Sequence, residues 1–133
     1  RTVTLAGECR FDGAFTFVYS PRAGTEAAEL TGRVPAGTVK RRMHELVALT
    51  QQMALAKNEL LIGDTVEVLV EGPSRQGGGQ WRGRTRQNKI VNFSVTDTEG
   101  KFTAGSFAQV FIESATSATL KGRSAAGAIP GLR

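Results

Sequence analysis

The stretch Trp81-Arg82-Gly83-Arg84-Thr85-Arg86-Gln87-Asn88-Lys89 carries four cations in nine residues. No acidic residue occurs between Pro73 and Thr96, and the residues on both sides of the stretch are typical of β-strands. In an extended strand, successive side chains point to opposite faces. The sequence therefore predicts a row of cations on one face of a sheet. We call this row the arginine ladder; it consists of Arg82, Arg84 and Arg86, with Trp81, Gly83 and Thr85 on the other face.

The residues around the ladder predict a small β-barrel. From Thr65 to Glu71 the pattern alternates, with three valines inward and Glu67 and Glu71 outward. Further strands are predicted at Trp81 to Arg86, Ile90 to Val95, Phe107 to Ser114 and Thr119 to Lys121, with a turn at Asp97 to Gly100. Five short antiparallel strands in about sixty residues fit a closed barrel of the oligonucleotide-binding kind.

The residues before the barrel predict a long helix and part of another fold. Apolar residues recur at helical spacing, so a helix is expected over residues 38–62, with Thr38 as its cap and Gly63 as its stop. The run from Ala14 to Tyr19 is apolar on both faces, as in a buried parallel strand, yet its neighbours are not evident in the chain. The expected fold class is α+β. Its parts are a remnant of a larger barrel (1–37), the connecting helix (38–62), the small barrel (63–122) and a disordered Ala/Gly-rich tail (123–133).

Composition bounds the possible functions. The chain has 133 residues and a formal net charge of +5, which favours an anionic partner. The single cysteine, Cys9, excludes an internal disulfide and a cysteine-rich metal site, and as a buried thiol it would suit a reducing cytoplasm. No apolar run approaches membrane-spanning length, so no membrane partner is expected. The only histidine, His44, falls on the predicted helix and the carboxylates are scattered, so the sequence predicts no active site.

The arginine ladder is the main candidate site. On a rigid sheet, guanidinium groups are suited to gripping a phosphate backbone, although simple surface charge is the alternative interpretation. Asn88 and Lys89 extend the cationic patch, and Lys101 and Lys121 are expected to flank it. Trp81 and Phe93 either stack on bases or belong to the core.

Two groups of segments carry a family resemblance. The first is Ala14-Phe15-Thr16-Phe17-Val18-Tyr19-Ser20-Pro21-Arg22-Ala23-Gly24-Thr25, followed by Val34-Pro35 and Val39-Lys40-Arg41-Arg42. The second is Val66-Glu67-Val68-Leu69-Val70-Glu71-Gly72, Gly83 to Lys89, Val91-Asn92-Phe93 and Thr119-Leu120-Lys121-Gly122. In this order they resemble the C-terminal end of the tRNA methylthiotransferases. The first group is similar to the last part of the catalytic radical S-adenosylmethionine barrel and the helix leaving it. The second is similar to the TRAM domain, the small RNA-binding barrel of these enzymes.

The resemblance implies a function for the whole enzyme and a smaller one for this chain. The family uses iron–sulfur clusters and S-adenosylmethionine, and the most similar member methylthiolates isopentenyladenosine next to the tRNA anticodon. The cysteines that hold the clusters are absent here, and Cys9 matches neither cluster motif. We therefore expect a C-terminal fragment, without cofactors of its own, that binds the anticodon region of tRNA but does not catalyse.

Some assignments stay open on the sequence alone. Arg22 lies in the loop that the resemblance places at the catalytic mouth, where it faces tRNA or a cofactor, or else stabilises a turn. The chain is alternatively a stand-alone RNA-binding module, or a module that docks on its own catalytic domain. The segment from Phe15 to Tyr19 is expected to be disordered, to pair with another copy, or to fold back.

Overall fold

The computed structural model describes residues 1–75, 77–95 and 102–125. Two compact units divide the chain between Met53 and Ala54, inside the long helix α3 (Ala36–Glu59). The first unit also holds α1 (Thr2–Cys9) and α2 (Glu26–Glu29). No helix in the described part of the chain is long and apolar enough to span a membrane.

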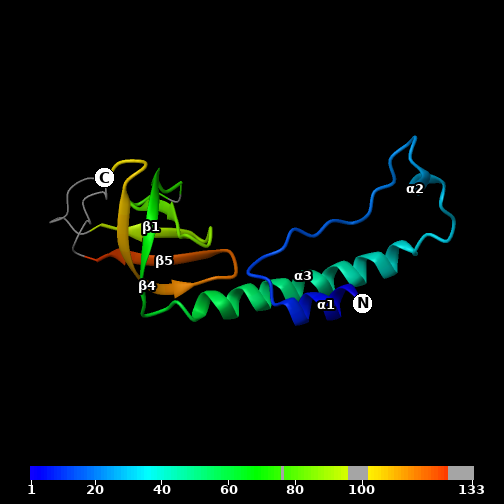
Figure 1. Ribbon diagram of the computed structural model, residues 1–133, viewed down its shortest axis with the longest axis horizontal. Coiled ribbons are helices and arrows are strands. Elements are labelled where there is room, and N and C mark those ends of the chain that lie inside the picture. Colours follow the sequence, from blue (N-terminus) through cyan, green and yellow to red (C-terminus); the bar gives the residue numbers. More distant parts are fainter. Residues whose placement is uncertain (76, 96–101, 126–133) are drawn as a thin grey trace. The chain divides into compact units, whose positions relative to one another are not determined.

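In the first unit, α1 lies beside α3 (Figure 1). Ala6 is buried, and a Cβ atom added at Gly7 would lie 3.9 Å from Leu49 Cδ2 of α3. The expectation of a buried thiol was wrong, because Cys9 lies at the exposed end of α1. α3 begins two residues earlier than the sequence predicted.

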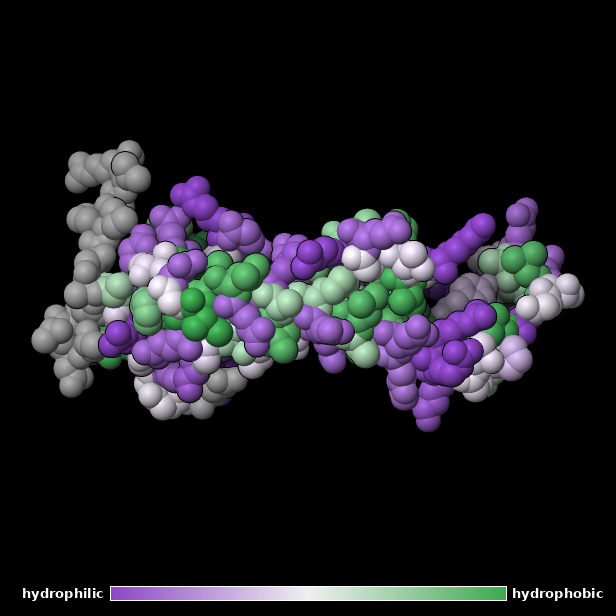
Figure 2. Space-filling model, turned by 90° about the horizontal axis from the view of Figure 1, so that it is seen from below, coloured by the Kyte–Doolittle hydropathy of each residue, from purple (hydrophilic) through white to green (hydrophobic). Residues whose placement is uncertain are grey.

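Large apolar side chains are unusually exposed in the first unit. Most of the exposed large apolar side chains among the described residues precede α3. Phe15 and Phe17 are the most exposed of them, at 95% and 83% of their full solvent-accessible surface. Figure 2 shows one face of the molecule, on which apolar surface (green) alternates with polar surface (purple). The predicted strand from Ala14 to Tyr19 does not form in the structure. An isolated strand leaves its backbone groups unpaired, so without neighbours this segment stays irregular.

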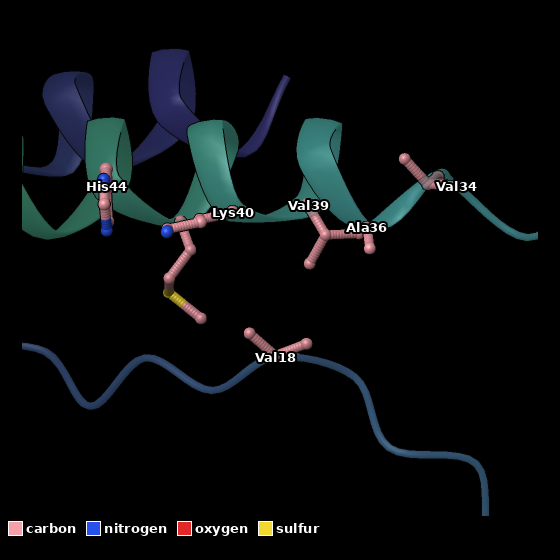
Figure 3. Close-up of a pocket in the computed structure, with 7 residues that line it drawn as sticks. Val18, Val34, Ala36, Val39, Lys40 and His44 are labelled. Carbon is pink, nitrogen blue, oxygen red and sulfur yellow. The ribbon is translucent and has the colours of Figure 1, made fainter.

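The same segment partly folds back within its own unit. Val18 points toward α3 across a hollow of about 460 Å³ that is also lined by Val34, Val39 and Met43 (Figure 3). Tyr19 Oη donates a hydrogen bond to the Ala27 carbonyl of α2, at 3.0 Å. Of the three outcomes expected for this segment, folding back is the one that these contacts support.

The second unit is a closed five-stranded barrel, as the sequence predicted (Figure 1). Its strands are β1 (Thr65–Pro73), β2 (Trp81–Arg84), β3 (Ile90–Ser94), β4 (Phe107–Ala115) and β5 (Thr119–Ser124), in the order β1-β2-β3-β5-β4. Four pairings are antiparallel, but β3 and β5 run parallel, so the expectation of a purely antiparallel barrel was wrong for that pair. The predicted turn from Asp97 to Gly100 lies outside the described residues.

The barrel core follows the predicted alternation. Inward side chains from all strands except β2 are fully buried, namely Val68, Val70, Val91, Phe93, Ala108, Val110, Ile112 and Leu120. β2 contributes Gly83 at its inward position, where the strands approach too closely for a side chain. β5 continues to Ser124, so Arg123 and Ser124, expected to begin the tail, are paired in the sheet. Positions 126–133 lie outside the described residues.

Asn58 in the last turn of α3 connects the helix end to the barrel. It is 4% exposed, donates from Nδ2 to the Thr116 carbonyl at 2.8 Å, and accepts from Lys89 Nζ at 2.7 Å. All three residues belong to the second unit. The Nζ atom of Lys89, which the sequence placed beside the arginine ladder, therefore contacts α3.

We expect Asn58→Ala to lower the free energy of unfolding of the barrel by about 1–3 kcal/mol, because buried polar partners lose a hydrogen bond. Urea denaturation monitored by Trp81 fluorescence measures this change. The control is Glu59→Ala, an exposed substitution in the same turn, for which a change within about 0.5 kcal/mol is expected. Equal effects of the two substitutions would contradict the anchoring role of Asn58.

Candidate nucleic-acid interface

The alternation of the arginine ladder is confirmed. Gly83 and Thr85 are buried, whereas Arg82 and Arg84 are partly exposed on the outer face of the barrel. β2 ends at Arg84, so Arg86 lies not in the strand but in the turn that follows it. The side chain of Arg86 is 80% exposed.

A tight turn between β2 and β3 positions Arg86. Thr85 N donates to the Lys89 carbonyl at 3.0 Å, and Asn88 N donates to the Thr85 carbonyl at 2.9 Å. Asn88 closes the turn with a φ of 62°, a left-handed conformation that asparagine tolerates better than most residues. Asn88 Oδ1 also accepts from Arg84 Nη1 at 2.8 Å. Asn88 thus shapes the turn and orients one arginine of the ladder.

Two glutamates of β1 face the ladder. Glu71 Oε1 lies 2.6 Å from Arg84 Nε, and Glu71 Oε2 lies 3.4 Å from Arg82 Nε. Glu67 Oε1 accepts from Arg86 Nε at 2.9 Å. The β1–β2 register shifts between Val70 and Gly72, which places Glu71 at the irregularity, within reach of two arginines.

These ion pairs leave much of each guanidinium available. The pairs are partly exposed to solvent, and such pairs contribute only about 0–1 kcal/mol each, so a phosphate can compete with the carboxylates. The carboxylates bind at Nε, and both terminal nitrogens of Arg86 make no hydrogen bond within the described part of the chain. Arg82 Nε is buried and has no hydrogen bond with good geometry, although Glu71 is nearby. The glutamates therefore orient the ladder while reducing its net charge.

The other candidate residues are dispersed. Lys121 is exposed on β5 and shares a cross-strand row with Arg82, but Asn92 of β3 lies between them. Asn92 is buried and its Oδ1 accepts from Ser74 Oγ at 3.1 Å, so it separates the two cations. Lys101 lies outside the described residues.

The two aromatic candidates belong to the core rather than to the outer face. Phe93 is fully buried. Trp81 is half-buried and packs edge-on against Phe102, with ring centroids 6.1 Å apart. Of the two interpretations, stacking on bases or packing in the core, the structure supports packing for both.

Arg22 lies in the first unit, in a turn closed by a hydrogen bond from Thr25 Oγ1 to the Arg22 carbonyl at 2.8 Å. Its side chain is exposed. The residues around it do not fit an iron–sulfur cluster, because Cys9 is the only thiol of the chain. Within residues 1–75, 77–95 and 102–125, no group of three or more His, Cys, Asp or Glu side chains is arranged to hold a metal ion.

Sequence reasoning found the outward position of Glu67 and Glu71 but missed their contact with the ladder. The sequence contained a signal for this contact. Both acids lie on the predicted outer face of the strand that immediately precedes the strand with the arginines, and neighbouring strands of a hairpin bring such side chains together. It also missed Asn58, whose role depends on where the helix end meets the barrel.

Comparison with known proteins gives consistent matches. The family model described as the TRAM domain matches residues 59–124. The tRNA-2-methylthio-N(6)-dimethylallyladenosine synthase of Moorella thermoacetica is 51% identical over 92 residues, which cover 69% of this chain and 21% of that protein. The proteins of the same name from Bacteroides thetaiotaomicron and Clostridium novyi are 42% identical over 122 residues and 45% identical over 101 residues. These alignments cover 91% and 75% of this chain, and 26% and 22% of the two relatives. The chain thus spans about a quarter or less of the length of these relatives.

Proposed function

We propose that this chain, which carries a TRAM domain, binds tRNA through the arginine ladder. The premise is that the chain is related to the C-terminal region of the tRNA methylthiotransferases. The observation that carries the proposal is the outward placement of Arg82 and Arg84 on β2 and of Arg86 in the turn that follows, with the guanidinium groups of Arg84 and Arg86 oriented through Nε by glutamates of β1. An oriented guanidinium loses less conformational entropy when it binds a phosphate, and its remaining nitrogens match the phosphate oxygens.

The proposal extends to the protein in which such a chain acts. Relatives are named for methylthiolation of dimethylallyladenosine in tRNA, so the chain would hold tRNA for a radical S-adenosylmethionine enzyme of that kind. The modified nucleotide would be the one next to the anticodon, and the site of action the cytoplasm. Iron–sulfur clusters and S-adenosylmethionine would be supplied by the catalytic part, which is the second partner of this chain. The chain itself would bind without catalysing.

A second candidate is docking on the catalytic part of the same enzyme. The observation that favours it is the exposure of Phe15, Phe17 and Tyr19, which leaves apolar surface that a neighbouring strand would cover. This candidate concerns the first unit and makes no use of the ladder. If docking is the whole function of the chain, the chain should show little affinity for free tRNA.

Titration of the chain with tRNA at several salt concentrations separates the two candidates. Each phosphate contact adds roughly 0.7–0.9 to the slope of log affinity against log salt. Contacts from two or three arginines predict a slope of about −1.4 to −2.7. A flat salt dependence, or no binding at low salt, would contradict tRNA binding and leave docking as the function.

A further inference from the structure

A shallow hollow of about 300 Å³ lies on the outer face of the barrel beside the arginine ladder. Its lining includes Leu69 of β1, Phe107 of β4, and Arg84 and Arg86 of the hairpin. All of these residues belong to the second unit. The hollow therefore combines apolar side chains with cationic groups, and Glu67, which pairs with Arg86 Nε, lines it as well.

The strand register explains how the hollow forms. Leu69 is the cross-strand partner of Arg84 on one side and of Phe107 on the other. Neighbouring strands lie about 4.8 Å apart, so Phe107 sits about 10 Å from the backbone of Arg84 on the same face. Leu69 and Phe107 are 41% and 46% exposed, while their inward neighbours Val68 and Ala108 are buried.

The chemistry of the hollow matches one nucleotide. An exposed phenylalanine offers an aromatic face, on which a base stacks whatever its sequence. The guanidinium groups of Arg84 and Arg86 line the same hollow, so they can reach the phosphates that flank such a base. Asn88 also lines the hollow, and its Nδ2 makes no hydrogen bond within the described residues, which leaves a donor for the edge of a base.

We propose that an unpaired base of single-stranded RNA stacks on Phe107 in this hollow, while Arg84 and Arg86 hold the adjacent phosphates. This inference rests on the proposed tRNA binding and specifies which part of the RNA is bound. A base inside a duplex is already stacked on its neighbours and cannot present its face to a side chain. The hollow thus gives the chain a preference for single-stranded loops, which phosphate contacts alone do not provide.

The experiment compares the whole chain with Phe107→Leu and Phe107→Trp. The probes are a single-stranded RNA oligonucleotide carrying 2-aminopurine and a fully paired duplex of the same length. Phe107→Leu is expected to weaken binding of the single strand about 5- to 100-fold and to abolish the change in 2-aminopurine fluorescence, because the stacking surface is lost. Binding of the duplex and the salt slope should stay unchanged, and Phe107→Trp should retain binding of the single strand.

The outcomes separate this inference from the proposed function. If the unaltered chain binds both RNAs but Phe107→Leu changes neither, the stacking site is refuted and tRNA binding stands. If the unaltered chain binds neither RNA, both proposals fail. Equal losses for single strand and duplex, with an unchanged thermal midpoint, would assign Phe107 to positioning the arginines and overturn the stacking role.

Discussion

Replacing both Arg84 and Arg86 with alanine is expected to weaken tRNA binding about 30- to 150-fold. Each arginine would lose a charged contact worth roughly 1–1.5 kcal/mol, and a tenfold change in affinity corresponds to about 1.4 kcal/mol. The salt slope should fall in magnitude by about 1.4–1.8, since two phosphate contacts disappear. The barrel should remain folded, because the ion pairs of both arginines lie at its surface and contribute little to its stability. Fluorescence anisotropy with labelled tRNA at several salt concentrations gives both quantities.

The matched control for net charge is Arg123→Ala. Arg123 lies on β5, which is not adjacent to β2, and it pairs with Glu113 at 3.4 Å in the same manner as the ladder arginines pair with β1. Two single variants, Arg84→Ala and Arg86→Ala, show whether the losses add. If Arg123→Ala reduced the affinity and the slope as much as each single variant does, tRNA binding would depend on overall charge and not on the ladder.

The inward and outward positions of the barrel residues could be predicted because they follow from local alternation. A run such as Val66 to Val70 has only one way to bury its valines, and Arg82, Gly83 and Arg84 follow the same rule. Closure of five strands into a barrel also followed from their number and length, although the order of the strands did not. The parallel pairing of β3 with β5 could not be predicted, because two short strands carry no sequence signal of their relative direction.

The electrostatic setting of the ladder could not be predicted from the stretch itself. An arginine-rich segment without acids looks strongly cationic along the chain, but cross-strand neighbours decide its local charge. Here the irregularity near Glu71 brings one carboxylate to both Arg82 and Arg84. The strand predicted from Ala14 to Tyr19 does not form because it has no neighbouring strand in the part of the chain that the structure describes. Its residues favour a strand, but a strand needs hydrogen-bonding partners that its own sequence cannot supply.

Gly122→Ala is expected to have the largest effect on stability. Gly122 is buried on β5, where it pairs with Phe93 of β3 and Ile112 of β4. A Cβ atom there would collide with the backbone carbonyl oxygen of Phe111. A backbone oxygen cannot rotate away as a side chain can, so the β4–β5 pairing that closes the barrel would have to open. We expect the free energy of unfolding to fall by about 3 kcal/mol or more.

Urea denaturation of the barrel measures this effect, and Gly37→Ala is the matched control. Gly37 lies near the start of α3, where an added Cβ meets nothing within 4 Å. The same substitution there should leave the free energy of unfolding of the barrel unchanged within about 0.5 kcal/mol, because Gly37 belongs to the first unit and its added Cβ meets no neighbour. A loss below about 1 kcal/mol for Gly122→Ala would mean that the two strands can separate without cost, and the barrel would then not be the rigid support that the arginine ladder requires. A large loss, accompanied by loss of tRNA binding, would tie the ladder to the closed barrel, since the same three arginines would remain in the chain without a common face.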